Sequence, residues 1–308
     1  MHNLKGFIYG IASSATFGLI PLFTLPLMAA GLTFDTILFY RFLIATLSIG
    51  TILLWKKESF RITRKEGFVL CLLGVMYACS ALFLFWSYTF LSSGIATTIH
   101  FLYPVFVTII MISAFREKKS FWTFLAIGQA VTGVAFLSSG PAEATLSLTG
   151  IFIAAVSGLC YALYIVGVNK SGIRNMNGLK LTFYVLASGT CLFFILSGAK
   201  ETFRALPDTQ ALFNICMLAV VPTVVSNLTL VMAVKHIGST LTSILGAMEP
   251  VTAVCIGVFV FHEPFTSNLM AGILFIILAV STVILSKNLP AALGKFRKRL
   301  TESIIRKG

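Results

Sequence analysis

The sequence is dominated by apolar stretches of about 20 residues, which recur along almost its whole length. A helix of that length spans roughly 30 Å of hydrocarbon, where backbone polar groups must be satisfied internally. Charged residues make up only 11% of the chain. We therefore predict an all-α membrane protein with ten transmembrane helices and no soluble domain. The predicted spans are 6–30, 34–55, 67–91, 94–115, 120–140, 147–170, 177–198, 210–235, 240–261 and 266–286.

Lysines and arginines are distributed unevenly between the two sides of such a bundle. With ten helices, 20 of the 23 basic residues fall on one side, Lys200 and Arg204 fall on the other, and Arg41 lies within a span. Because basic connections stay in the cytoplasm, we predict a multi-pass protein of the cell (inner) membrane with cytoplasmic N- and C-termini. The net charge of +13 is then a topology signal, so we expect no nucleic-acid partner.

The segment that starts at residue 92 matches the segment that starts at residue 238, at an offset of about 146 residues. Pro104 then lies opposite Pro250, and Glu117 lies opposite Glu263. This offset contains five predicted spans. Because five is odd, equivalent helices must cross the bilayer in opposite directions. Inverted repeats of this kind are typical of secondary transporters, whose substrate site lies near the midplane between the repeats.

The chain therefore divides into a first five-helix repeat at 1–140, a second at 141–286 and a basic tail at 287–308. We predict that the two inverted repeats surround a central cavity. We expect the tail, which contains GKFRKRLTESIIRKG, to contact anionic lipid headgroups. A solvated tail that acts only on topology is the alternative.

Several short motifs carry a resemblance to a known family. They are the arginine in LFYRFLIATL, EPVTAV in the ninth span, FVFHEPFT at its end and LMAGILFIILAVSTVIL in the tenth. Together with the two halves, they resemble the EamA-like branch of the drug/metabolite transporter superfamily. The resemblance covers nearly the whole chain. It implies a compact bundle in a bacterial-type inner membrane, a cavity lined by spans 1, 3, 4, 6, 8 and 9, and transport without nucleotide hydrolysis.

Glu249 is the acidic residue inside the ninth span, roughly 14 Å from its cytoplasmic end. A charge at the centre of a membrane helix costs about 2.5–3.5 kcal/mol, so we expect this side chain to face the protein interior. Desolvation favours the protonated carboxyl group, which makes proton coupling a hypothesis for this residue. A structural hydrogen bond to a neighbouring helix is the alternative.

Two prolines occupy matched positions in the fourth and ninth spans, at Pro104 and Pro250. Proline removes a backbone donor and disturbs the preceding turn, so we predict a kink in each span. Paired kinks at symmetry-related positions are candidate gate hinges. Bends without a role in gating are the alternative.

The fourth span carries a polar face at helical spacing, made by Thr97, His100, Pro104 and Thr108, with Tyr103 beside it. At the repeat offset Tyr103 corresponds to Glu249, so the two stripes are expected to face each other. His100 could relay protons or hold an anionic group, and its alternative role is to link helices.

Further polar residues lie at middle depth in other spans. We expect the long side chain of Arg41 to reach the headgroups by snorkelling. The alternatives are a charge pair with Glu249 and a contact to a substrate carboxylate. Candidate cavity residues are Thr16, Tyr77, Tyr161, Tyr164 and Asn227.

The sequence has no phosphate-binding loop and no HExxH or GxSxG motif, so we predict no ATP hydrolysis, no enzyme activity, no cofactor and no metal site. The leading hypothesis is a secondary transporter of small organic metabolites or amino acids. It would work by alternating access as an exporter, with protons as a further coupling partner. The alternative is a lipid flippase or integral-membrane enzyme that uses His100 and Glu249.

Overall fold

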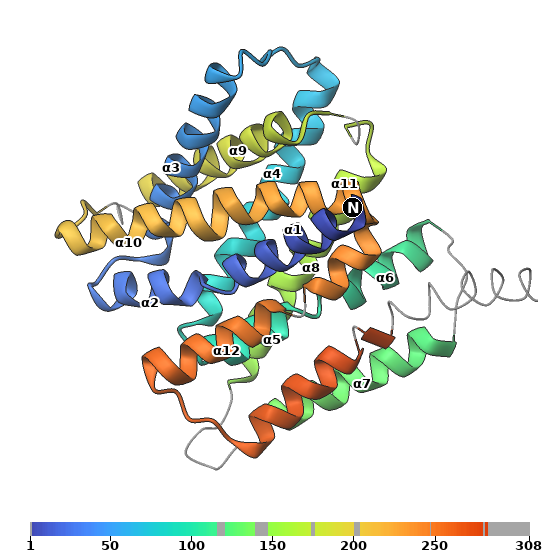
Figure 1. Ribbon diagram of the computed structural model, residues 1–308. Helices are drawn as coiled ribbons and strands as arrows, with labels where there is room; N and C mark the ends of the chain where they lie inside the picture. Colours follow the sequence, from blue (N-terminus) through green and yellow to red (C-terminus); the bar gives the residue numbers. More distant parts are fainter. Residues whose placement is uncertain are drawn as a thin grey trace, which may run out of the picture.

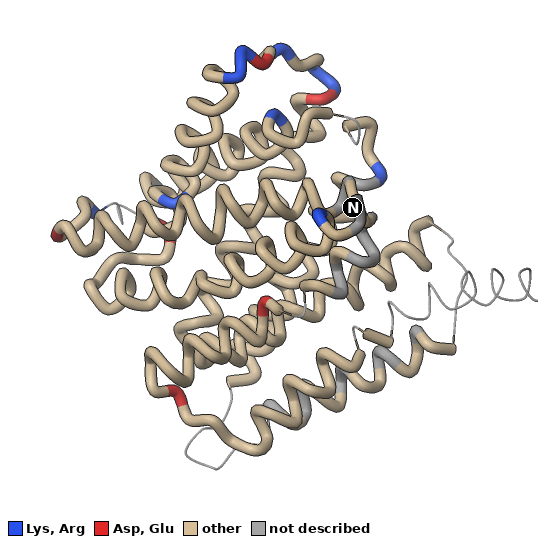
Figure 2. Tube along the Cα trace, viewed as in Figure 1, with Lys and Arg blue, Asp and Glu red and all other residues tan. Residues whose placement is uncertain are grey.

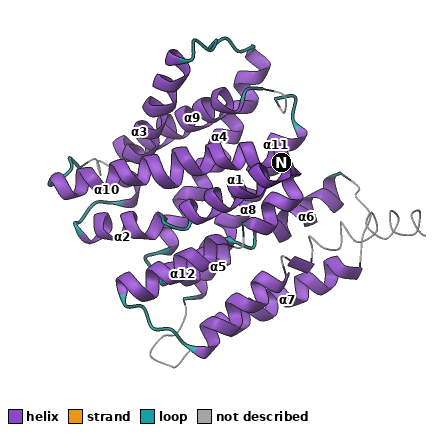
Figure 3. Cartoon of the chain, viewed as in Figure 1, coloured by secondary structure: helices purple, strands orange, loops and turns teal. Residues whose placement is uncertain are grey.

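The computed structural model describes residues 2–115, 121–138, 147–173, 176–199, 204–246, 248–279 and 281–282. Within these ranges every regular element is a helix (Figures 1 and 3). The helices are α1 (His2–Phe17), α2 (Ile20–Ala29), α3 (Phe34–Trp55), α4 (Arg64–Ser87), α5 (Ser93–His100), α6 (Tyr103–Ala114), α7 (Phe121–Ser138), α8 (Leu148–Lys170), α9 (Gly178–Ala199), α10 (Thr209–Ala219), the π-helical turn η2 (Val220–Val225), α11 (Ser226–Leu245), α12 (Met248–Phe261) and Ser267–Ala279.

The helices pack into a bundle that brings the two halves of the chain together. Helix α1 lies along α11, α3 along α9, and α4 between α8 and α9. Helix α5 contacts both α8 and α12. Close approach depends on small residues, as is usual for membrane helices. At Gly74, for example, an added Cβ would lie 2.7 Å from the carbonyl oxygen of Val185 in α9.

The outer surface of the bundle is strongly apolar. It carries many large apolar side chains, among them Phe68, Phe152 and Phe259, whose exposed fractions are 70–77%. In water such a surface would be costly, whereas against lipid chains it is not. Lysines and arginines gather at the ends of helices, most densely between α3 and α4 (Figure 2). The molecule is a multi-pass membrane protein.

The predicted count of ten transmembrane helices is not confirmed in the described ranges. Seven stretches there are long and apolar enough to cross a membrane, and Met248–Phe261 and Ser267–Ala279 are shorter apolar helices. The predicted boundary between the eighth and ninth spans, at 236–239, also differs from the structure, because α11 continues to Leu245. The basic tail at 287–308 lies outside the described residues, as does Glu117.

Predicted spans 1 and 4 are interrupted near their middle. Helix α1 ends at Phe17 and α2 starts at Ile20, while α5 ends at His100 and α6 starts at Tyr103. In the ninth span, α11 ends at Leu245 and α12 starts at Met248. The chain therefore breaks its helices at several places inside the bundle.

The predicted proline kinks are wrong in form. Pro104 lies in the first turn of α6, and Pro250 lies in the first turn of α12. The first four backbone N–H groups of a helix have no partner within that helix, so a proline there removes no helical hydrogen bond. Each proline begins a new helix instead of bending a continuous one. The polar face assumed to run unbroken from Thr97 to Thr108 is likewise divided by this break.

Candidate functional site

Helices α5 and α12 come from different halves of the chain and pack side by side (Figure 1). Ser93, the first residue of α5, is hydrogen-bonded to Glu263, just beyond the end of α12. His100, the last residue of α5, lies beside Glu249, near the start of α12. The two helices therefore run antiparallel, as the odd repeat offset predicts for the matched spans.

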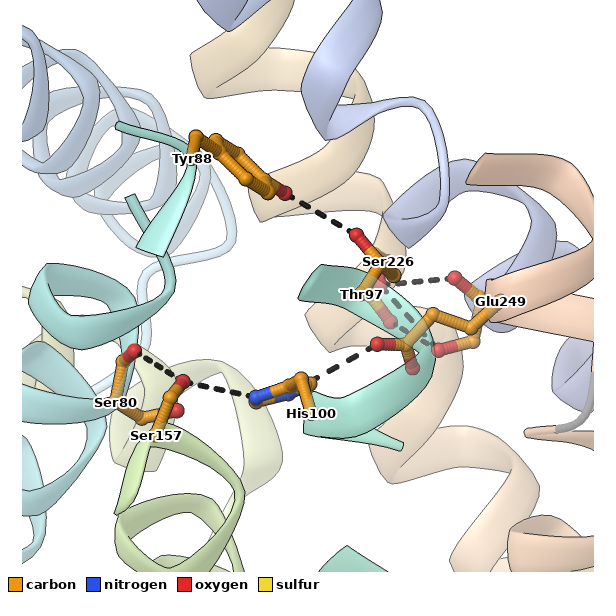
Figure 4. Close-up of polar contacts among 8 residues, drawn as sticks. Ser80, Tyr88, Thr97, His100, Ser157, Ser226 and Glu249 are labelled. Atoms are coloured by element: carbon orange, nitrogen blue, oxygen red, sulfur yellow. Dashed lines mark hydrogen bonds and ion pairs between the residues drawn. The ribbon is translucent and has the colours of Figure 1, made fainter. Parts of the chain in front are cut away.

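His100 and Glu249 form a buried pair across this contact (Figure 4). The histidine is 1% exposed and the glutamate 3%. The distance from His100 Nε2 to Glu249 Oε1 is 3.8 Å, which is too long for a hydrogen bond. Neither atom has a hydrogen-bond partner among the described residues. A small movement of either side chain would bring them into bonding distance.

The other side of the imidazole is held by two serines. Ser157 Oγ donates to the carbonyl oxygen of Ser80 at 2.6 Å and lies 2.9 Å from His100 Nδ1. A hydroxyl group has one proton to donate, so Ser157 accepts from Nδ1–H. The neutral histidine therefore carries its proton on Nδ1 and presents the lone pair of Nε2 to Glu249. Gly158 allows this close approach, since a Cβ there would lie 2.7 Å from the carbonyl oxygen of His100.

Aromatic rings surround the histidine. Tyr161 and Tyr103 lie 5.4 and 5.9 Å from His100 between ring centroids, and Phe17 stacks on the imidazole at 6.2 Å. Tyr103 and Tyr161 meet edge to face at 4.8 Å. These rings come from α1, α6 and α8, so the site joins both halves of the chain. Phe17 was not among the residues predicted from the sequence.

The aromatic cluster continues through two further tyrosines to a buried amide. Tyr77 lies 5.1 Å from Tyr164 and 6.2 Å from Tyr161 between ring centroids. Asn227 donates to the Tyr77 hydroxyl at 3.0 Å and to the carbonyl oxygen of Thr223 at 2.7 Å. All four predicted residues are at least 95% buried. The structure thus groups Tyr77, Tyr161, Tyr164 and Asn227, although nothing in their spacing predicted these contacts.

Arg41 does not snorkel to the headgroups, and that prediction is wrong. The side chain is 1% exposed, and its Nε donates to Thr223 Oγ1 at 2.7 Å. Its guanidinium lies over the rings of Phe42 and Phe85, at 5.9 and 5.5 Å. Such cation–π contacts and an interior hydroxyl hold the group inside the bundle, so it has no need to reach the interface. No ion pair between Arg41 and Glu249 is present.

Two predicted residues have their hydroxyl groups engaged elsewhere. Thr16 donates to carbonyl oxygens of its own helix, at Ala12 and Ser13, and among the described residues no hydrogen bond joins its side chain to the tyrosine cluster. Thr97 is buried and lies 3.3 Å from the hydroxyl of Tyr88. Within the described residues, Thr16 is therefore the candidate least connected to the site.

Glu263 makes a contact between the two halves, and its partner could not be identified from the sequence. Its Oε1 accepts from the backbone N–H of Ser93 at 3.0 Å and from the Ser93 hydroxyl at 2.8 Å. A carboxylate at this position satisfies free N–H groups at the start of α5 and interacts favourably with the helix dipole. Gly257 leaves the space, because an added Cβ would collide with the carboxylate. The partner is 170 residues away, so only the fold reveals it.

Comparisons with known proteins agree with this architecture. The EamA-like transporter family model matches twice, at residues 4–139 and 148–285. An uncharacterized transporter from Synechocystis sp. (strain ATCC 27184 / PCC 6803 / Kazusa) is 23% identical over 212 residues, which cover 68% of this chain and 64% of the relative. The chain thus spans less than two thirds of that relative's length. A crystal structure of another protein is similar in fold, with a TM-score of 0.65, 16% identity, and coverage of 94% and 98% of the two chains.

Two repeats of apolar helices, each matched by the transporter family model, make this a multi-pass membrane protein of the transporter class. The family match extends over almost all of the chain. The chain belongs to the EamA-like transporter family.

Proposed function

We propose that this chain is a secondary transporter that exports small organic metabolites or amino acids across the inner membrane by alternating access, with proton coupling. The observation that carries the proposal is the His100–Glu249 pair. It is buried, it joins the two halves of the chain, and its facing atoms have no hydrogen-bond partner among the described residues.

The geometry of the pair favours one shared proton. With that proton, either Glu249 donates to Nε2 or the charged imidazolium faces the carboxylate. Without it, a carboxylate would face a lone pair in a desolvated site, and with a second proton an imidazolium would be left unpaired. A site that prefers one proton can exchange it when substrate or water enters. This exchange would couple transport to the proton gradient.

Alternating access requires contacts between the two halves to break and re-form. Glu263 with Ser93 is one such contact, at the far end of α5 from His100. The interrupted helices place backbone breaks next to the buried pair, at the ends of α5 and α11. We propose that these breaks, with Pro104 and Pro250, act as the hinges of the gating movement.

The burial of the pair supports a soluble substrate over a lipid. A flippase needs a polar path open to the bilayer, whereas His100 and Glu249 are 1% and 3% exposed. We therefore place the substrate inside the bundle, in a central cavity beside the tyrosine cluster.

A two-stage experiment tests the proposal. A metabolite library is first screened for ligands that raise the melting temperature of the purified protein. Hits are then tested in proteoliposomes, with the pH gradient imposed in either direction. We expect substrate to move against its gradient, driven by protons moving the other way. If no hit crosses the membrane under any gradient, the transporter assignment for this chain is overturned.

A further inference from the structure

Arg41 is a buried cation that the proposed proton exchange does not use. It lies in α3 and is 1% exposed. In the part of the chain that the structure describes, its guanidinium makes one hydrogen bond, to Thr223, and no carboxylate lies within ion-pair distance. A guanidinium carries five N–H donors, so most of its donor capacity is left for another partner. A buried charge without a counter-ion is unfavourable, which favours binding of an anion next to it.

The π-helical turn that contains Thr223 orients the guanidinium of Arg41. Pro222 lies in the π-helical turn η2 and has no N–H to offer the carbonyl oxygen of Leu218. The hydroxyl of Thr223 donates to that oxygen at 2.9 Å instead. Its proton is thereby used, so Thr223 accepts from Arg41 Nε. The bond fixes one edge of the guanidinium and leaves its two terminal nitrogens available. π-Helical turns of this kind are frequent at functional sites.

The cation is connected to the tyrosine cluster by direct contacts. Phe42 lies under the guanidinium and is 5.6 Å from the ring of Tyr77. Asn227 bonds both the backbone of Thr223 and the hydroxyl of Tyr77. Tyr77 in turn packs on Tyr161, next to His100. A continuous polar and aromatic path therefore joins a basic end at Arg41 to an acidic end at Glu249.

We propose that Arg41 is the anion-binding end of the substrate site and that the transported molecules carry a carboxylate group. This inference rests on the proposed transport function. Guanidinium matches a carboxylate with two parallel N–H···O bonds, and a single positive charge balances a single negative one. A phosphate, with a charge of about −1.5 to −2, would need more cationic partners than this cluster supplies. The carboxylate is also one of the two charged groups of a free amino acid.

Matched ligand pairs test the inference on the unmodified protein. The probes are free amino acids and short monocarboxylates, each compared with its carboxamide, together with inorganic phosphate and simple phosphate monoesters. Binding is measured by thermal stabilisation, and transport by uptake into proteoliposomes. We expect carboxamides to bind about 10- to 100-fold more weakly than the matched carboxylates, as for a lost charged hydrogen bond.

Variants then locate the effect. Arg41→Gln should remove the preference for carboxylates, and Arg41→Lys should retain part of it, because the charge remains while the planar fork is lost. Arg204→Gln is the matched control, since Arg204 is an exposed arginine that bonds the carbonyl oxygen of Gly31. It should leave the preference unchanged. If Arg41→Gln does not fold, Arg41→Lys assigns the effect to this residue, and the ligand pairs on the wild type still decide whether a carboxylate is required.

The outcomes separate this inference from the transport function. Transport of carboxamides, cations or phosphates as effective as that of carboxylates would overturn the role of Arg41 and leave the transporter assignment standing. If no compound crosses the membrane in any arm, the transport function fails, and the inference fails with it.

Discussion

The interrupted spans in the two halves share a backbone plan and differ in their side chains. In each, a helix stops inside the bundle and a new helix starts within three residues, with a proline in its first turn. At the repeat offset, however, His100 corresponds to Gly246, and Tyr103 corresponds to Glu249. The first half thus supplies the imidazole, and the second half supplies the carboxyl group.

This difference shows how two halves with the same backbone plan can form a single proton site. Matched carboxyl groups in both halves would face each other as like charges, and each would oppose ionisation of the other. An imidazole opposite a carboxyl group instead forms one pair that shares one proton. The common backbone plan can serve movement in both halves, while the unlike side chains make the proton site unique.

The largest expected effect comes from removing the titratable group of the second half. Glu249→Gln keeps the size and one hydrogen-bonding oxygen but cannot release a proton. We expect accumulation driven by a pH gradient to be abolished in proteoliposomes. Exchange of labelled for unlabelled substrate, which needs no net proton movement, should continue. Accumulation at the wild-type level would remove Glu249 from the coupling role.

A smaller effect is expected from the first half. His100→Gln should reduce gradient-driven transport at least about 10-fold, because a positioned proton acceptor is lost. Ser157→Ala is the companion variant, since it leaves the imidazole in place and removes the acceptor for Nδ1. We expect Ser157→Ala to shift the pH profile of transport with a smaller loss of rate. Loss of rate without any change of pH profile in both variants would indicate that His100 only links helices.

The contact between α5 and α12 can be broken at its other end. Glu263→Ala removes two hydrogen bonds to Ser93 and a favourable helix-terminus charge, so the free energy of unfolding should fall by about 1–3 kcal/mol. Glu66→Ala is the matched control, because Glu66 caps its own helix by accepting from Thr63 at 2.7 Å. The free energy of unfolding should fall less in Glu66→Ala than in Glu263→Ala, as thermal unfolding of the two variants would measure. Equal losses in the two variants would mean that the Glu263 contact between the halves contributes no more to stability than a local helix cap.

The smallest effect on stability is expected at the prolines. Pro104→Ala and Pro250→Ala should change the free energy of unfolding by no more than about 1 kcal/mol, because each proline occupies a helix start where no helical hydrogen bond is missing. Turnover should slow more than ligand binding weakens. Paired measurements of the transport rate and of ligand dissociation constants check this, and equal changes in both would argue against a hinge role.

The helical class, the two repeats and the family could be predicted from the sequence, because apolar length and the matched segments are local or periodic signals. The breaks in the helices were harder to predict. Pro104 and Pro250 indicated irregular backbone, but a kink and a new helix start have the same sequence signature. Residues 236–239 include Gly238, which favours a connection in a sequence, yet α11 continues through them.

Side-chain partners at the site could be predicted only in part. Repeat alignment placed Glu249 opposite the fourth span, but the contact with His100 depends on how α5 and α12 pack. The burial of Arg41 was missed because the sequence gives only the depth of this residue in its span, and that depth allows snorkelling. Its interior partner, the hydroxyl of Thr223, lies in a π-helical turn 182 residues away. Ser157 and Glu263 form contacts over 57 and 170 residues, which no local pattern reveals.

Proton release on substrate binding tests the account most directly. The purified wild type, saturated with its transported substrate in weakly buffered solution, should release a proton that a pH indicator detects. Glu249→Gln should bind the same substrate and release none. Equal proton release by the two proteins would contradict the central claim that the carboxyl group between the two halves holds the exchangeable proton.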